Sequence, residues 1–298
     1  MSDTLPPLLP RPPLLLPDAV RDARAGLRAG LADLLVVPDA ALEGNWSWRA
    51  GMADIRYGFY RQYERLEEAT ADARRVLDET GTHPAPGGRI LADAVAARWE
   101  INGLLAMVAP ADVDADAGGE WTLRQVLSHL IDGQDRYNRN SANSVLGMPG
   151  LPPIDADPRY DGTAAELDSR LGSVLDHGIA YLGGLDDDEL ARPSRWMGFA
   201  VTVGFRLGRF GSHLREHTIQ LDKTLDLLGR RPTEVERMIR HVCGAYGRLE
   251  GTVCALPPGA LDVPGSLGRT AAGIVGTAVA ACRRDSATIR AAAEAGAP

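Results

Sequence analysis

The sequence predicts an all-α protein. Apolar residues recur at helical spacing from residue 18 almost to the C-terminus, and alternating β-branched runs with Asn-Gly turns are almost absent. Three Thr-x-x-Gln or Thr-x-x-Glu sequences also have the form of capping boxes, which mark helix starts. The chain has 298 residues, of which 45% are apolar, so it can form one large or two ordinary domains.

The expected elements follow one another along the chain. Residues 1–17 are rich in proline and predict an extended arm that lies on the body of the protein. Capping boxes begin at Thr122, Thr163 and Thr233, and segments rich in Gly, Pro or Asp separate the helical runs. The pattern predicts eight helices, at 18–36, 50–80, 88–109, 122–146, 163–183, 203–229, 233–256 and 269–294.

Composition excludes several classes of function. The net charge of -8 argues against a nucleic-acid partner, and no apolar run approaches the ~18 residues needed to cross a membrane. Residues 1–17 lack the basic start of a signal peptide. Cys243, Cys254 and Cys282 are odd in number and have no metal-ligand spacing. They predict free thiols in a reducing compartment, so we expect a cytoplasmic protein.

Three histidines are candidate metal ligands. His213 and His217 are four residues apart in the expected helix 203–229, so both lie on one face, one turn apart. This spacing allows two imidazoles to bind one ion, although a pair of surface histidines has the same spacing. His129 lies at the edge of the apolar stripe of helix 122–146 and, taken singly, is a core-edge histidine.

Taken together, these residues resemble a known family. The run Trp121-Thr122-x-x-x-x-Leu127-x-His129, followed later by His213-x-x-x-His217, is similar to the DinB-like four-helix-bundle proteins. The resemblance covers about residues 88–229. It implies that His129, His213 and His217 bind one divalent metal ion. The superfamily includes thiol-dependent S-transferases and mycothiol-dependent maleylpyruvate isomerase, so it also implies a metal-dependent transferase or isomerase that uses a low-molecular-weight thiol.

The three imidazole ligands narrow the choice of metal, and the composition narrows the choice of thiol. Three imidazoles suit zinc, nickel or iron rather than magnesium or calcium, and three protein ligands leave open coordination positions, as in catalytic sites. Lys223 is the one lysine among many arginines, a bias typical of a GC-rich genome. Such a genome suggests an actinobacterial source, in which the thiol would be mycothiol. The expected partners are therefore this thiol and a small electrophilic substrate.

Five further residues are candidates for catalysis or substrate binding near the metal. Asp132 follows His129 by three residues and is a candidate general base. Arg136 and Arg209 lie on roughly the ligand faces of their helices and could clamp a substrate carboxylate. Gln220 could bind substrate or orient a ligand histidine, and Trp196 could wall the pocket. Solvated helix faces or pairs within one helix account equally well for the two arginines.

The flanking helices predict a second, degenerate bundle. A shift of 148 residues overlays the helices at 88–146 on those at 233–294, and a shift of 150 overlays Trp46 on Trp196. Residues 18–80 and 233–294 would then close a second bundle in permuted order, unless the identities arose by chance among Ala- and Gly-rich helices. The positions equivalent to His129, His213 and His217 would be Thr277, Tyr63 and Glu67. We therefore expect one metal centre per chain.

Other functions stay open at this point. The chain could be a non-catalytic DinB-like protein that binds a metal or small ligand without turnover. A three-histidine iron enzyme that uses oxygen is another alternative, although relatives of that kind need a further catalytic domain after the bundle. In a purely structural helical protein, the three histidines would never meet. The Ala- and Gly-rich helix 269–294 suits either packing within the chain or close pairing with a second copy in a homodimer.

Overall fold

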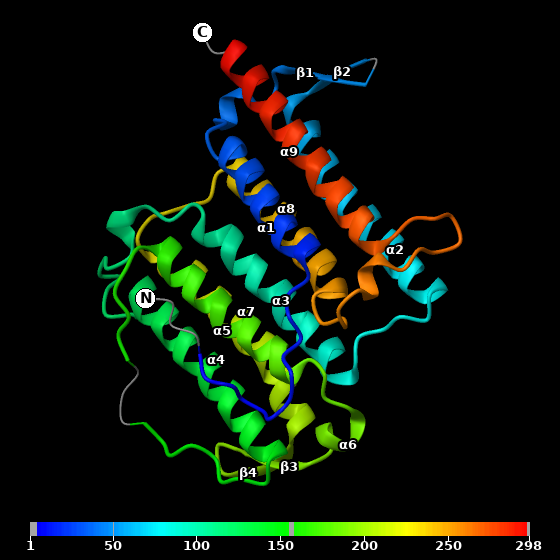
Figure 1. Ribbon diagram of the computed structural model, residues 1–298. Coiled ribbons are helices and arrows are strands. Elements are labelled where there is room, and N and C mark those ends of the chain that lie inside the picture. Colours follow the sequence, from blue (N-terminus) through cyan, green and yellow to red (C-terminus); the bar gives the residue numbers. More distant parts are fainter. Residues whose placement is uncertain (1–4, 50, 155–157, 297–298) are drawn as a thin grey trace.

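The structure is a computed structural model that describes residues 5–49, 51–154 and 158–296. Within them the protein is mostly helical, which confirms the predicted fold class (Figure 1). Short 3-10 turns lie at Asp39–Ala41, Pro110–Asp112 and Ala260–Asp262. The α-helices are α1 Asp18–Leu34, α2 Ile55–Glu79, α3 Pro86–Leu105, α4 Leu123–Val145, α5 Ala164–Leu182, α6 Asp187–Leu190, α7 Val203–Leu227, α8 Glu234–Val253 and α9 Ala271–Ala295.

Side-chain caps mark the starts of most of the long helices, though not of α1 and α3. The side chains of Thr122, Thr163 and Thr233 each accept a hydrogen bond from the backbone N–H three residues later, and the Gln or Glu at that position bonds back. All three predicted capping boxes are therefore confirmed. Among the described helices, none is long and apolar enough to span a membrane.

Two antiparallel β-hairpins were missed in the sequence. They are β1 (Asn45–Trp48) with β2 (Gly51–Asp54), and β3 (Pro193–Trp196) with β4 (Phe199–Thr202). The helix predicted from residue 50 is therefore wrong over 51–54, and residue 50 itself lies outside the described residues. Met197 and Gly198 both have positive φ, as the favoured two-residue hairpin turns require. Strands of four residues are too short to give a clear alternating pattern.

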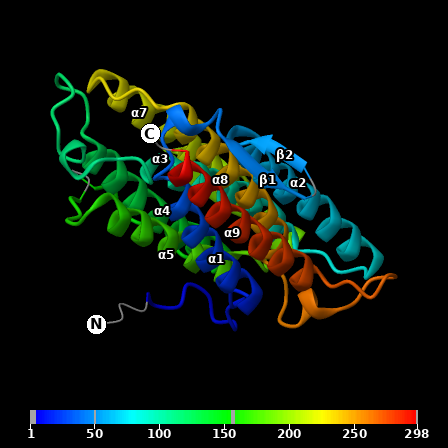
Figure 2. The same cartoon turned by 90° about the horizontal axis from the view of Figure 1, so that it is seen from above.

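The long helices form two groups of four. Helices α3, α4, α5 and α7 pack together and are called the central bundle; α1, α2, α8 and α9 pack together and are called the flanking bundle. Helices α3 and α8 are in direct contact and join the two groups (Figure 2). Figure 1 shows the β1–β2 hairpin at one end of the molecule and the β3–β4 hairpin at the other. Helix α9 packs on α1 and α2, while a homodimer stays a prediction.

Apart from α1 and α5, whose starts are 146 residues apart, the paired strands and long helices of the two bundles repeat at one interval. Strand β3 begins 148 residues after β1, α7 begins 148 after α2, α8 begins 148 after α3, and α9 begins 148 after α4. The shift of 150 expected for the N-terminal pair is therefore wrong. With the corrected shift, the positions equivalent to His129, His213 and His217 are Thr277, Arg65 and Ala69. Tyr63 and Glu67 are not the equivalents.

Glycines permit the close contact between α3 and α8. A Cβ at Gly103 would lie 3.0 Å from the Cα of Arg240, and a Cβ at Gly251 would lie 2.7 Å from the carbonyl oxygen of Ala92. Gly251 follows Gly103 by 148 residues, and Arg240 follows Ala92 by the same interval. The two contacts are thus related by the repeat, and we infer that an approximate two-fold axis passes between α3 and α8.

The proline-rich arm lies against the central bundle over its described residues, 5–17. Leu9 is buried, the N–H of Leu14 donates to the carbonyl of Ala180 at 2.7 Å, and Arg11 pairs with Glu189. Residues 1–4, at the start of the predicted arm, lie outside the described residues. The arm therefore contacts α5 of the central bundle and the short helix α6 before the chain enters the flanking bundle at α1.

Candidate metal centre

Three histidine side chains from two helices of the central bundle meet at one point. His129 comes from α4, and His213 and His217 come from successive turns of α7. The Nε2 atom of His213 lies 3.1 Å from the Nε2 of His129 and 3.1 Å from the Nε2 of His217. The ligand atoms of the three residues all lie within 4.8 Å of one another. The fold thus brings together residues that are far apart in sequence.

The chemistry of these nitrogens fits a divalent metal ion. A neutral imidazole has one N–H, so His213 Nε2 cannot make good hydrogen bonds to both facing nitrogens at once. Burial, and then the nearby His217 and His129, lower the pKa of His213 to about 3, so its ring is neutral. Two nitrogens that each lie about 2.0–2.1 Å from one zinc ion can be about 3 Å apart. The three residues therefore fit as ligands.

Neighbouring side chains hold the imidazoles in place. The Oε1 of Gln220 lies 2.6 Å from the Nδ1 of His217, which places the hydrogen of that ring on Nδ1 and leaves Nε2 a lone pair. The Nδ1 of His213 is buried and has no hydrogen-bond partner among the described residues. The rings of Trp121 and Tyr137 lie 5.2 Å from those of His129 and His213, respectively. The ligand rings are thus packed between helices.

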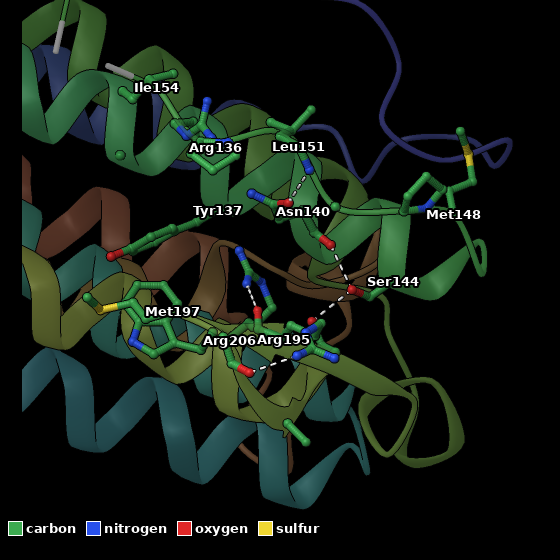
Figure 3. A pocket seen from close by; sticks show the side chains of 18 of the residues that line it. Arg136, Tyr137, Asn140, Ser144, Met148, Leu151, Ile154, Arg195, Met197 and Arg206 are labelled. Carbon is green, nitrogen blue, oxygen red and sulfur yellow. Dashed lines mark hydrogen bonds between the residues drawn. The ribbon is translucent and has the colours of Figure 1, made fainter. Parts of the chain in front are cut away.

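A pocket of about 940 Å³ opens beside the histidines. Its walls are the exposed face of α4, the loop at 147–154, the β3–β4 hairpin and the start of α7. Figure 3 shows Tyr137 and Asn140 on one side of the pocket and Arg195, Met197 and Arg206 on the other. The volume is at the upper end of the range for small-molecule sites, and His129 and His213 form part of the lining.

The central bundle carries the signature of a known family. Residues 93–221, from within α3 to within α7, match the model of the DinB superfamily. This part of the chain belongs to the DinB superfamily. No curated protein and no solved structure matches the chain. The DinB match includes the three histidines and most of the pocket wall, and it stops short of the flanking bundle at both ends.

The DinB pocket contains some of the expected substrate residues and not others. Asp132, Arg136 and Trp196 line it, and Arg136 donates to the carbonyl of Pro152. Arg209 does not line it. Both terminal nitrogens of that guanidinium donate to the Glu216 carboxylate at 2.8 Å.

Gln220 also lies outside the pocket lining, since its amide oxygen faces His217. Direct substrate binding by Arg209 and Gln220 stays a prediction, which their positions outside the pocket lining do not favour. The guanidinium of Arg209 binds the carboxylate of Glu216 on the same helix, and Gln220 lies where it can orient the ring of His217.

Sequence reasoning missed several residues of the DinB pocket. Tyr137 was not among the expected site residues, although it lines the pocket and lies against His213. Asn140 and Ser144 follow at helical spacing on the same face of α4, so the periodicity measured from His129 could have indicated all three. Arg195 and Met197 could not have been found in this way, because they depend on the unrecognised β3–β4 hairpin.

Gly133 supplies space for a ligand ring in the DinB site. A Cβ at this position would lie 2.9 Å from Cε1 of His213. We expect Gly133→Ala to displace the ring and weaken metal binding roughly tenfold to a hundredfold, as measured by competition with a chromogenic chelator. Gly208→Ala, on α7, is the matched control, because a Cβ there meets nothing within 4 Å. Equal affinities in the two variants would contradict this role for Gly133.

Proposed function

We propose that this protein is a metal-dependent transferase or isomerase that uses a low-molecular-weight thiol, and that the thiol is mycothiol. The observation that carries the proposal is the convergence of three histidine nitrogens beside a large pocket in a DinB-superfamily bundle. Three protein ligands leave coordination positions open to a small molecule, as in catalytic metal sites. The DinB superfamily includes metal-dependent enzymes, which agrees with this assignment.

The residues at the site have distinct roles in this proposal. His129, His213 and His217 would hold one zinc, nickel or iron ion, whose charge lowers the pKa of a thiol bound beside it. Asp132, on the pocket wall one turn after His129, would accept the proton that the thiol releases. Burial raises the pKa of Tyr137 to about 12, so its hydroxyl stays protonated and can donate a hydrogen bond.

The thiol has to come from outside the protein. Cys243, Cys254 and Cys282 are free but buried, and none of them lines the pocket. Burial also raises the pKa of each of the three thiols. A cysteine with a raised pKa in an apolar environment is a poor nucleophile. The choice of mycothiol rests on the family resemblance and on the excess of arginine over lysine in the composition.

A spectroscopic titration tests the proposal. The protein is loaded with Co²⁺, and mycothiol is added while the visible spectrum is recorded. We expect a new sulfur-to-cobalt charge-transfer band that saturates near one thiol per chain, because a thiolate would occupy an open position. Glycerol at the same concentrations is the control without a thiol. A spectrum that stays unchanged at saturating mycothiol would rule out thiol-dependent chemistry at this centre.

A further inference from the structure

The pocket contains a buried cation, Arg206, that pairs with no carboxylate of the described residues. Arg206, near the start of α7, is 6% exposed and lines the pocket. Its Nη1 donates to the main-chain carbonyl of Arg195, while its Nε is buried and has no hydrogen-bond partner among the described residues. An arginine side chain remains charged in a protein, so this guanidinium brings a positive charge and an unused donor to the pocket wall.

Two more arginines line the same pocket, and within the described part of the chain neither forms an ion pair. Arg195 donates to the carbonyl of Gly198 at 2.9 Å, and Arg136 donates to the carbonyl of Pro152. Among the described residues, no aspartate or glutamate forms an ion pair with Arg136, Arg195 or Arg206. Elsewhere arginines are matched with acids, as Arg24 is with Asp176 and Glu250. Among the described residues, the lining carries three arginines against one acidic residue, Asp132, so the charge of this part of the wall favours an anionic ligand.

The remaining wall of the pocket is apolar. Met148, Leu151, Ile154 and Met197 line it, and Figure 3 shows these four residues around the pocket. The ring of Trp196 lies beneath the Arg206 guanidinium, 5.6 Å from it. Cations together with apolar side chains suit a molecule with a carbon skeleton and an acidic group better than they suit an inorganic anion.

We propose that the second, electrophilic substrate is an organic carboxylate, and that Arg206 is the residue that receives its carboxylate group. Arg195 and Arg136 add positive charge on the same and the opposite wall, and the carbon skeleton extends along the apolar lining toward His129 and His213. The identification of this acid as the electrophile rests on the proposed function. The carboxylate site itself does not, because it depends on the arginines and not on the metal.

The arrangement also explains why Arg206 has this role and Arg209 does not. Both residues precede His213 on α7, by seven and four positions, so helical spacing places both near the ligand face. Glu216 lies two turns after Arg209 and binds its guanidinium at two points. Arg206 has no such acid on its helix and is turned toward the β3–β4 hairpin, where a carboxylate could supply a bidentate partner.

A binding experiment with a short dicarboxylate tests this inference. Succinate and its neutral analogue succinamide are titrated into the full-length protein, with binding followed by calorimetry and by tryptophan fluorescence. We expect succinate to bind at least about tenfold more tightly than succinamide. We expect Arg206→Gln to weaken the binding of succinate by at least about tenfold. Arg206→Lys, which keeps the charge, should retain part of the affinity. Arg170→Gln should change it less than about twofold, since Arg170 also lies over a ring, that of Tyr160, but outside the pocket.

Several outcomes would overturn the inference. Equal binding of succinate and succinamide, or unchanged succinate affinity in a folded Arg206→Gln protein, would show that the arginine does not receive a carboxylate. Tighter binding of inorganic phosphate than of succinate would show a general anion site. The titration is repeated after dialysis against a chelator, and loss of succinate affinity with the metal would show that the metal alone holds the acid. Success here together with failure of the cobalt titration would retain the carboxylate site and reject thiol chemistry.

Discussion

A His213→Ala variant is expected to bind divalent metal roughly two to three orders of magnitude more weakly than the unmodified protein. His213 is the middle ligand, with its Nε2 3.1 Å from those of both His129 and His217. Its removal leaves two ligands on different helices and a gap where the buried ring lay. Affinity is measured by competition with a chromogenic chelator for Zn²⁺ and Ni²⁺.

His241→Ala is the matched control for this variant. His241 is an exposed histidine of α8 whose ring lies against that of Tyr63 in the flanking bundle, and we expect its removal to leave metal affinity unchanged. Equal affinities in His213→Ala and His241→Ala would show that any bound metal lies elsewhere. A loss of metal affinity in both variants would indicate that the assay reports metal binding to any histidine of the protein.

Gly251→Ala is expected to destabilise the protein by about 1–3 kcal/mol, the usual range for overpacking a core. The added Cβ would lie 2.7 Å from a main-chain oxygen, that of Ala92, and the backbone of α3 cannot move aside as a flexible side chain could. Helices α3 and α8 would have to separate along the contact between the two bundles. Urea unfolding followed by circular dichroism measures the change in the free energy of unfolding.

Gly276→Ala separates this effect from the general preference of helices for alanine. Gly276 is also within a long helix, α9, but a Cβ there meets nothing within 4 Å. We expect this control to be neutral or more stable by up to about 1 kcal/mol. Gly103→Ala, at the equivalent position of the repeat, should also destabilise the protein, since its Cβ would meet Arg240 Cα at 3.0 Å. A Gly251→Ala protein as stable as the Gly276→Ala protein would contradict the close helix contact.

Much of the helical framework could be predicted, because its signals are local. Capping boxes at Thr122, Thr163 and Thr233 involve residues three apart, and apolar periodicity needs only a few turns of sequence. The i, i+4 spacing placed His213 and His217 on one face of α7. Helix existence and the histidine pair therefore followed from short-range rules, whereas His129 joined the pair only through the family resemblance.

The composition of the pocket could not be predicted, because it depends on contacts between distant segments. The β3–β4 hairpin brings Arg195, Trp196 and Met197 against α4, and its four-residue strands gave no clear signal. Arg209 and Arg206 look equivalent on a helical projection. The hairpin buries Arg206, whereas Glu216 engages Arg209, and no local rule distinguishes these environments.

The flanking bundle shows how the corresponding site has changed. Arg65 occupies the position equivalent to His213 and pairs with Asp285 at 2.6 Å. Ala69 and Thr277 stand where His217 and His129 stand in the central bundle. An ion pair within the chain thus takes the place of the histidine cluster. A single metal centre per chain, and a scaffolding role for the flanking bundle, stay predictions.

The most direct test of the three-histidine metal centre is the metal content of protein purified without an affinity tag, measured by elemental analysis beside the His129→Ala variant. His129 comes from α4 and its partners from α7, so the comparison tests whether the three meet around one ion. We expect about one equivalent of zinc, nickel or iron per chain in the unmodified protein and none in the variant. No metal in either protein after reconstitution, or equal metal in both, would contradict this expectation.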